Sequence, residues 1–469
     1  MSDAESLSTL PGVIRRTVVA AIAVLMGLLS AGTAHPASGL AARLKVGATV
    51  LVPSGIDATG TRDVTAELNT FLATQAPGTT IAFPARGRYR VEGVVLVSGL
   101  HDLTIEGHAS TLFATTDGSA GPPPFYNYRS HWPRLREHVE IRDSERVTVH
   151  DLTVEGPNRD GTFKPELEGQ AGFVVSRSRG VTLDGVTARA TYGDGVYIVG
   201  GSVDVTIRRC VLDHNGRQGV AVVDGDNVTV EDCTIRATGR SVIDLEPGHG
   251  LVRTVHVRNN RVDGYVNFLL AAVGAGTGVQ DVSLENNQVK GGRGISVYVG
   301  TERSTRTGIH IIGNRGDASS SGYEGTLMRF TRFDGIEVRG NHQRVSAGTT
   351  PVVLHNSCNA TISGNDFGSV SSADVVKSDG DCTTGPQARF PTPSSVARGP
   401  RIPGSTPTSR ARAGRTTSTT SVVPVPRTPP EQHRTSWPLV VTAAALGVAV
   451  GIGGTVVVQR RRRNRTPAP

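Results

Sequence analysis

The chain has 469 residues, with 57 glycines, 26 prolines, four cysteines and only 4 % aromatic residues. Its net charge of +8 combines +12 in residues 383–469, which hold 13 arginines and one acidic residue, with −4 in residues 1–382. Because the region expected to fold is mildly acidic, the charge gives no support for nucleic-acid binding.

The first 34 residues have the pattern of a secretory signal peptide. Arg15 and Arg16 precede an uncharged run at residues 17–29, and small residues follow at 30–34. Such a segment is removed on export. We therefore expect an exported protein whose mature chain begins near residue 35 and whose cysteines meet an oxidising environment.

A short helix is predicted where the folded region begins. Val64, Leu68, Phe71 and Leu72 recur at helical spacing and make one apolar face. Strand-like segments follow at 78–84 and 88–91. We expect the helix to cover the open end of a hydrophobic stack, as terminal units of repeat proteins do.

A phrase of apolar, polar and apolar residues recurs ten times between residues 103 and 362. From residue 181 onward the copies start 24, 23, 27, 27, 27, 27 and 24 residues apart, a period typical of solenoids. The third residue after the phrase is asparagine in five copies and cysteine in two: Asn260, Asn287, Asn314, Asn341, Asn365, Cys210 and Cys233.

A second short strand precedes most of these phrases. It is predicted at 139–141, 173–175, 196–198, 220–222, 243–245, 266–268 and 295–297. Since no helix long enough for a crossover fits between the strands, like strands must stack in successive coils about 4.8 Å apart, as a parallel β-helix. The asparagines are expected to turn a corner in the left-handed region and to stack as a hydrogen-bonded ladder.

Residues 50–382 resemble the pectin lyase-like superfamily of right-handed parallel β-helices. The resemblance rests on the repeats and on the helix-then-strand start. It implies an all-β, right-handed solenoid of about ten coils with an N-terminal helical cap. It also implies a carbohydrate groove on the outward face of the second strand.

A typical polygalacturonase is not expected. Gly248-His249-Gly250 matches the letters of a motif in that family, but it stands at the far end of its strand. The adjacent Asp-Asp pair and the Arg-x-Lys element of the family are missing. The pattern looks closer to bacterial β-helix proteins grouped with carbohydrate lyases and epimerases.

Polar residues about 24 positions apart should converge on the outward face of neighbouring coils. The candidate catalytic residues are Asp194, Arg217, Arg240, Asp244 and Glu246. The candidate substrate-binding residues are Tyr197, Gln218, Asn267, Tyr298 and His249.

Three interpretations of this patch remain open. Asp244 and Glu246, two apart on one strand, would place their carboxylates on the order of 7 Å apart, within the inverting-hydrolase window. An arginine beside carboxylates would instead suit proton abstraction by a lyase or epimerase. The same residues also suit an ion-pair ladder, or a surface that binds glycans without cleaving them.

No cofactor is expected. The acidic corner at residues 224–227 has the residue types of a calcium site, but it lacks a visible full ligand shell. Cys358 and Cys382 flank the last coil, where they could either form a disulfide that clamps its end or stay as free thiols. Cys210 and Cys233 occupy equivalent places in adjacent coils, either as stacked thiols or as a second bond.

The carboxy-terminal region has three predicted parts. Residues 383–436 have the composition of a disordered stalk, 437–459 form a 20-odd-residue apolar span, and 460–469 are a basic cytoplasmic tail. Together with residues 35–382 as ectodomain, they predict a single-pass surface protein. We expect it to bind a polysaccharide and to cleave or epimerise it, or else to be a non-catalytic module that binds glycans or proteins.

Overall fold

The computed structural model describes residues 47–118, 136–247, 251–273, 278–301 and 306–381. All of them belong to one compact unit of the chain. The predicted signal peptide, stalk, membrane span and basic tail lie outside the described residues, as do His249 and Cys382. Within the described ranges, no helix is both long enough and apolar enough to cross a membrane.

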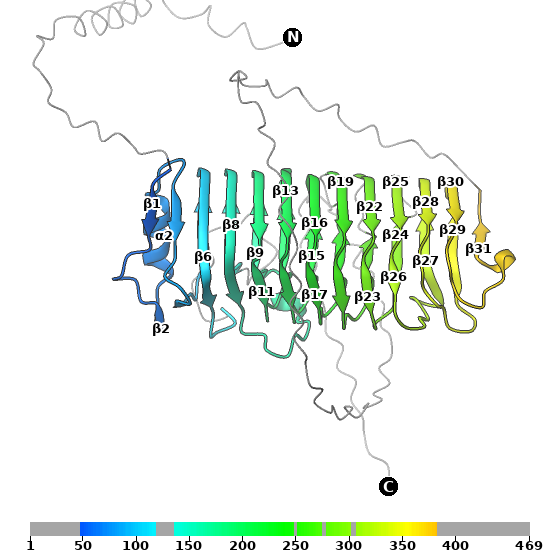
Figure 1. Cartoon of the computed structure of the whole chain (residues 1–469), viewed down its shortest axis with the longest axis horizontal. Helices are drawn as coiled ribbons and strands as arrows, with labels where there is room; N and C mark the ends of the chain where they lie inside the picture. The colour runs from blue at the N-terminus through cyan, green and yellow to red at the C-terminus, as the bar shows by residue number, and fades with distance from the viewer. Residues whose placement is uncertain (1–46, 119–135, 248–250, 274–277, 302–305, 382–469) are drawn as a thin grey trace, which may run out of the picture. The chain divides into compact units, whose positions relative to one another are not determined.

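The described part is a stack of coils whose strands pair in parallel with the coils before and after them (Figure 1). A first ladder joins β1 (Thr49–Leu51), β3 (Thr80–Ala82), β6 (His101–Phe113), β8 (Glu145–Glu155), β10 (Arg179–Asp184), β13 (Ser202–Arg208), β16 (Gly225–Glu231), β19 (Leu251–Arg258), β22 (Gly278–Glu285), β25 (Arg306–Ile312), β28 (Phe333–Arg339) and β30 (Cys358–Ser363).

A second ladder continues from the first, because β6 and β8 are long enough to take part in both. Its other strands are β2 (Thr59–Asp63), β4 (Arg88–Arg90), β11 (Thr187–Arg189), β14 (Val211–Asp213), β17 (Thr234–Arg236), β20 (Arg261–Asp263), β23 (Gln288–Lys290) and β26 (Arg315–Gly316).

The third ladder forms a separate sheet of 11 strands, one more than the predicted count of about ten coils. It consists of β5 (Val95–Ser98), β7 (Val139–Arg142), β9 (Phe173–Ser176), β12 (Val196–Val199), β15 (Val220–Val222), β18 (Ile243–Leu245), β21 (Leu270–Ala272), β24 (Val297–Gly300), β27 (Thr326–Thr331), β29 (Thr350–His355) and β31 (Val376–Asp379).

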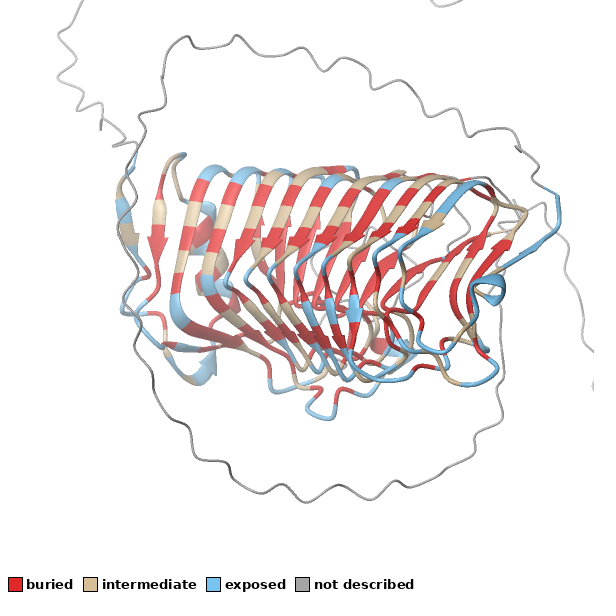
Figure 2. Cartoon of the chain, turned by 45° about the vertical axis from the view of Figure 1, so that its right-hand side comes forward, coloured by how far each residue is buried: buried red, intermediate tan, exposed pale blue. Residues whose placement is uncertain are grey.

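One apolar core runs through the stack from Val52 to Phe367. Alternation along each strand produces it: in β13, for example, Val205 and Ile207 are fully buried while Thr206 between them is not. Figure 2 shows these buried positions aligned from coil to coil. The sequence-based prediction of an all-β parallel solenoid is therefore confirmed.

Helix α2 (Thr65–Ala73) forms where a helix was predicted, beside the first coils (Figure 1). Val64, Leu68 and Leu72 are buried in the core, and Phe71 packs against it. The role of this helix as a cap of the stack stays a prediction. Among the described residues, two single 3-10 turns complete the regular elements, η1 (Pro165–Leu167) and η2 (Ser372–Asp374).

The predicted asparagine ladder is present. The side-chain amide of Asn287 donates to Val257 O (2.9 Å) and to Asn314 Oδ1 (2.9 Å). Its Oδ1 accepts from the backbone and side-chain amides of Asn260, both at 3.0 Å. Asn341 and Asn365 continue the pattern in the following coils.

The predicted conformation of these asparagines is wrong by one residue. The left-handed position is the residue before the ladder, as in Asn259 (φ 57°), Asn286 (φ 53°) and Gly313 (φ 65°). The corner therefore needs two residues. One adopts positive φ, and the next turns its amide into the stack, where the amide hydrogen-bonds to the neighbouring coil.

Cysteines extend the ladder toward the amino-terminus. Cys210 and Cys233 are buried and are not disulfide-bonded. The Cys210 N–H donates to Cys233 Sγ (3.3 Å), and the Cys233 N–H donates to Asn260 Oδ1 (2.9 Å). This confirms stacked thiols. Cys358 is disulfide-bonded, while its candidate partner Cys382 lies outside the described residues.

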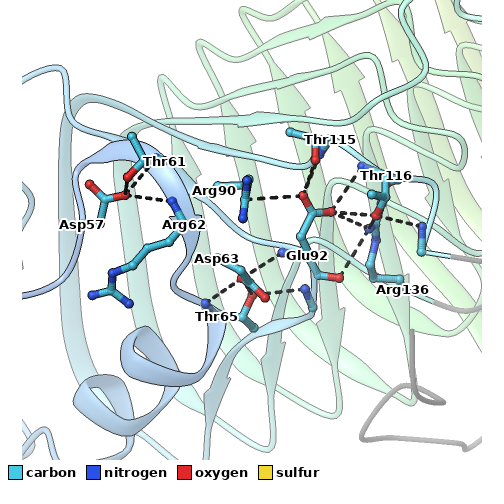
Figure 3. A network of polar contacts seen from close by, with 12 residues as sticks. Asp57, Thr61, Arg62, Asp63, Thr65, Arg90, Glu92, Thr115, Thr116 and Arg136 are labelled. Carbon is cyan, nitrogen blue, oxygen red and sulfur yellow. Dashed lines mark hydrogen bonds and ion pairs between the residues drawn. The ribbon is translucent and has the colours of Figure 1, made fainter. Parts of the chain in front are cut away.

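A group of polar contacts, the polar clip, links Glu92, Thr115 and Thr116 to Arg136 on the other side of residues 119–135 (Figure 3). Thr115 and Thr116 hydroxyls donate to the two carboxylate oxygens of Glu92, at 2.5 and 2.7 Å. From the other side, Arg136 Nη1 donates to Thr116 Oγ1 (3.2 Å) and contacts Glu92 (3.4 Å). These hydrogen bonds lower the pKa of Glu92 although its partial burial alone would raise it.

Candidate functional site

The outward face of the third ladder presents one column of side chains, each aligned with the next coil. Successive pairs in the register place Tyr197, Ala221, Asp244, Ala271, Tyr298 and Arg329 in this column. Neighbouring members are about 4.8 Å apart along the stack. The column therefore brings residues more than 100 positions apart onto one surface.

Two third-ladder strands lie further along the chain than predicted. β21 begins at Leu270 rather than residue 266, and β24 begins at Val297 rather than residue 295. As a result Ala271 takes the place expected for Asn267, and Tyr298 lies in the same column as Asp244. Residues 266–268 have the alternating pattern of a strand although the strand lies elsewhere. The observed strand Leu270–Ala272 is buried throughout and shows no alternation.

Arg217 forms the centre of a cluster of carboxylates. Its guanidinium contacts Asp194 Oδ2 (3.0 Å), Glu246 Oε1 (2.5 Å) and Glu168 Oε2 (3.3 Å). The side chain is only 14 % exposed. Burial opposes its charge, but the carboxylates, Asp194 foremost, raise the pKa of Arg217 well above its ordinary value. Arg217 is thus a fixed cation that cannot act as a base.

Asp194 and Gln218 are the buried hydrogen-bonding partners of this cluster. Asp194 Oδ1 accepts the Gln218 backbone N–H (2.9 Å) while Oδ2 holds Arg217. Burial raises the pKa of Asp194 to about 6, against the opposing effect of Arg217. The Gln218 side chain donates to Asp244 Oδ2 (2.5 Å) and accepts the Ser241 N–H (2.8 Å). Gln218 therefore positions Asp244.

Asp244 and Glu246 form a carboxyl pair. Burial first, and then the charge of Glu246, raise the pKa of Asp244 well above its ordinary value, and a side-chain hydrogen bond between the two contributes. Such a contact is closer than the expected separation of about 7 Å, because both side chains converge near Arg217.

The two carboxyls differ in access. Asp244 is 5 % exposed. The Glu246 side chain is 32 % exposed. Burial therefore favours the proton on Asp244, and Glu246 is the member that reaches the surface.

The remaining predicted residues are only partly brought together. The Arg240 guanidinium lies 4.7 Å from the centre of the Phe163 ring, not against the carboxyl pair. Tyr197 is in the column two coils before Asp244, buried in an outward apolar cluster with Val174 and Ala221. Asn267 lies before β21 and outside the column.

Several residues near the pair were not predicted. Glu168 follows the 3-10 turn η1, in an insertion whose return to the sheet no repeat pattern reveals. Phe268 and Tyr323, which were not predicted, form an aromatic cluster with the predicted Tyr298, with ring centres 4.3 to 5.4 Å apart. Arg329 lies over the Tyr298 ring (5.8 Å). Tyr323 belongs to no repeat, so its aromatic side chain was the one feature of the sequence that could have suggested a place in the site.

The acidic corner at residues 224–227 is engaged in protein contacts. Asp226 forms an ion pair with Arg253, and Asp224 Oδ1 accepts the Leu251 N–H (3.0 Å). Throughout the described ranges, no group of three or more His, Cys, Asp or Glu residues is placed to hold a metal ion.

Comparison with known proteins agrees with the architecture. The model of the family described as "right handed beta helix region" matches residues 137–302. No protein with a curated description matches the sequence.

Solved structures resemble the chain at low identity. The Family 28 exopolygalacturonase of Yersinia enterocolitica is 13 % identical over 71 % of this chain and 76 % of its own, with a TM-score of 0.52. The endo-xylogalacturonan hydrolase of Aspergillus tubingensis is 14 % identical over 70 % of this chain and 95 % of its own (TM-score 0.48). The Streptococcus pneumoniae adhesin PfbA is 13 % identical over 68 % and 97 % (TM-score 0.45).

At these identities the likeness concerns the fold alone. The family model, the first of these structures and the parallel register of all three ladders agree. The described part of this chain is a right-handed parallel β-helix with the pectin lyase-like fold.

Proposed function

We propose that this protein is a polysaccharide hydrolase whose acid is the Asp244–Glu246 carboxyl pair. The observation that carries the proposal is a buried carboxyl, Asp244, held by Gln218 and placed against a second, accessible carboxyl. Two carboxyls close together in a low-dielectric site disfavour double ionisation, so the pKa of one of them is raised. General acid catalysis of glycoside cleavage needs such a proton.

The pair would act at the outward face of β18. A glycosidic oxygen at Glu246 receives the shared proton as its bond to the anomeric carbon breaks. Water adds to that carbon, and its released proton returns to the pair. Arg217 keeps Glu246 oriented through its Nη2 and stabilises the charge left on the pair after donation.

The charge of the cluster favours a neutral sugar at the cleavage point over a uronate. Arg217 already contacts Asp194, Glu246 and Glu168, so it is not available to hold a substrate carboxylate. Three carboxylates around one arginine leave an excess of negative charge, which repels an anionic sugar. The lyase and epimerase interpretations need the opposite arrangement.

Two further observations support a glycan substrate. An exopolygalacturonase shares the fold at a TM-score of 0.52, so this architecture accommodates polysaccharide hydrolysis. The sequence pattern of the termini supports export and membrane anchoring, which would place the groove at the cell surface.

The test is a screen of the full-chain protein against neutral and acidic polysaccharides. New reducing ends report hydrolysis, and absorbance at about 235 nm reports the unsaturated product of a lyase. We expect reducing ends without absorbance, and a loss of at least about a hundredfold in turnover for Asp244→Asn. Asp226→Asn, which removes a surface ion pair, is the matched control and should keep full activity. Unchanged turnover in Asp244→Asn would refute the assignment.

The second candidate is a non-catalytic glycan-binding module, favoured by the aromatic cluster. Tyr298 lies two coils beyond Asp244, about 10 Å along the stack, with the small Ala271 between them. Aromatic rings of this kind provide an apolar face for sugar rings. Binding on a glycan array that Tyr298→Ala abolishes, with no product from any bound glycan, would establish this function instead of hydrolysis.

A further inference from the structure

A separate hollow of about 270 Å³ lies where the second ladder ends. Its lining residues are Arg315, Gly316, Asp317, Ala318, His342 and Arg344. The register places Arg315 beside His342 on the next coil. None of these residues belongs to the Arg217 cluster or to the third-ladder column.

The hollow has a rigid floor. A side chain at Gly316 would collide with Gln343, since its Cβ would lie 1.8 Å from the Gln343 Oε1. Gln343 is fully buried, and its amide donates to Ala318 O (2.5 Å) and Arg344 O (2.8 Å). Its Oε1 accepts the Ile295 N–H (3.1 Å). The backbone around the hollow is thus fixed from beneath.

The lining carries two guanidiniums, one imidazole and the carboxylate of Asp317, and Asp366 lies beside it, where the charges of His342 and Arg344 act on its carboxylate. Arg315 and Arg344 are exposed, and within the described ranges neither forms an ion pair with a carboxylate. His342 Nδ1 contacts Asp366 (2.8 Å). The one acid in the lining, Asp317, accepts the Gly291 N–H (3.1 Å) through its Oδ1.

We propose that this hollow binds a single tetrahedral oxyanion, a phosphate or sulfate group. Guanidinium groups present paired N–H donors that match such oxygens, and two of them with an imidazole surround a group from more than one side. The volume admits one such group, below the size usual for a whole drug-sized ligand. The group is either a free ion or an ester on a sugar.

The experiment is calorimetric titration of the full-chain protein at low salt. The probes are inorganic phosphate, inorganic sulfate, glucose 6-sulfate and unmodified glucose. We expect saturable binding of the anions but not of glucose, with affinity falling as NaCl rises. Arg315→Gln and Arg344→Gln should each weaken binding about tenfold or more.

Arg261→Gln is the matched control. Arg261 lies in the same column two coils earlier, is exposed and does not line the hollow. Because it leaves the basic carboxy-terminal region unchanged, it also accounts for non-specific anion binding there. Arg344→Lys keeps the positive charge but removes the paired N–H donors of the guanidinium. Its anion affinity should therefore lie between those of wild type and Arg344→Gln.

Each outcome decides the proposal. Tighter binding of glucose 6-sulfate than of sulfate identifies a sugar ester as the ligand, and equal binding identifies a free ion. Equal affinity in wild type and both glutamine variants, or no saturable binding of any anion, would overturn the site. Activity of the Asp244–Glu246 pair is independent of either result, since the two sites share no residue.

Discussion

His138 gives a prediction that follows directly from the structure. It is fully buried at the start of β7, and neither ring nitrogen has a hydrogen-bond partner. Burial, with a smaller effect of Arg136, lowers the pKa of His138 from 6.5 to about 3. The folded protein therefore keeps this imidazole neutral at pH values where the unfolded chain protonates it.

The sign and size of the effect follow by linkage. Between pH 6.5 and 3 the unfolded chain binds more protons at this site, so folding stability decreases as pH falls. Relative to pH 8, the two pKa values give a cost of about 2 kcal/mol at pH 5 and about 3.5 kcal/mol at pH 4. Nothing is lost above about pH 7.5, where both states are neutral.

The assay is urea unfolding of wild type and His138→Leu across pH 8 to 4. Since no hydrogen bond is removed, the leucine variant should be at least as stable as wild type at pH 8. Acidification should then destabilise wild type more than the variant, by about 2 kcal/mol at pH 5. Other groups titrate in both proteins and cancel in the difference. Parallel pH profiles for the two proteins would refute the reasoning.

Three other predictions concern the ladder, the carboxyl pair and the thiols. Asn287→Ala removes four buried hydrogen bonds and should cost at least about 3 kcal/mol in urea unfolding, with Asn267→Ala as a nearly neutral control. The pKa of Asp244 is raised on folding, so its ionisation destabilises the protein as pH rises. Asp244→Asn should therefore gain up to about 1.4 kcal/mol of relative stability per pH unit above about pH 4, measured by the same titration, and a constant difference would argue against it. Cys210 and Cys233 are buried, and the hydrogen bond with Cys210 followed by burial raises the pKa of Cys233. Mass spectrometry should show no alkylation of either thiol by iodoacetamide at pH 8 until urea is added, and rapid native labelling would contradict their placement.

The fold was predictable because its core repeats in the sequence. An alternation of apolar and polar residues, as around Val205 and Ile207, predicts both that the segment is a β-strand and which of its faces is buried. The prediction failed where the outward face is itself buried. At Leu270–Ala272 no polar residue marks the strand, and the nearby alternating segment 266–268 was chosen instead.

The sequence predicted which residues come together in the site better than it predicted how their side chains are arranged. A fixed period brings Asp194, Arg217 and Asp244 together, because residues one period apart become neighbours. Side-chain direction does not follow from the period, so the close contact of Asp244 with Glu246 and the position of Arg240 over Phe163 were not foreseen. Glu168 comes from an insertion, and insertions do not obey the repeat.

The clip of Glu92, Thr116 and Arg136 connects the described segments on the two sides of residues 119–135. The two ends are held by carboxylate, hydroxyl and guanidinium contacts of the coils themselves. A single carboxylate thus couples two segments that lie 20 positions apart in the sequence, and the loss of its charge would weaken both sets of contacts together.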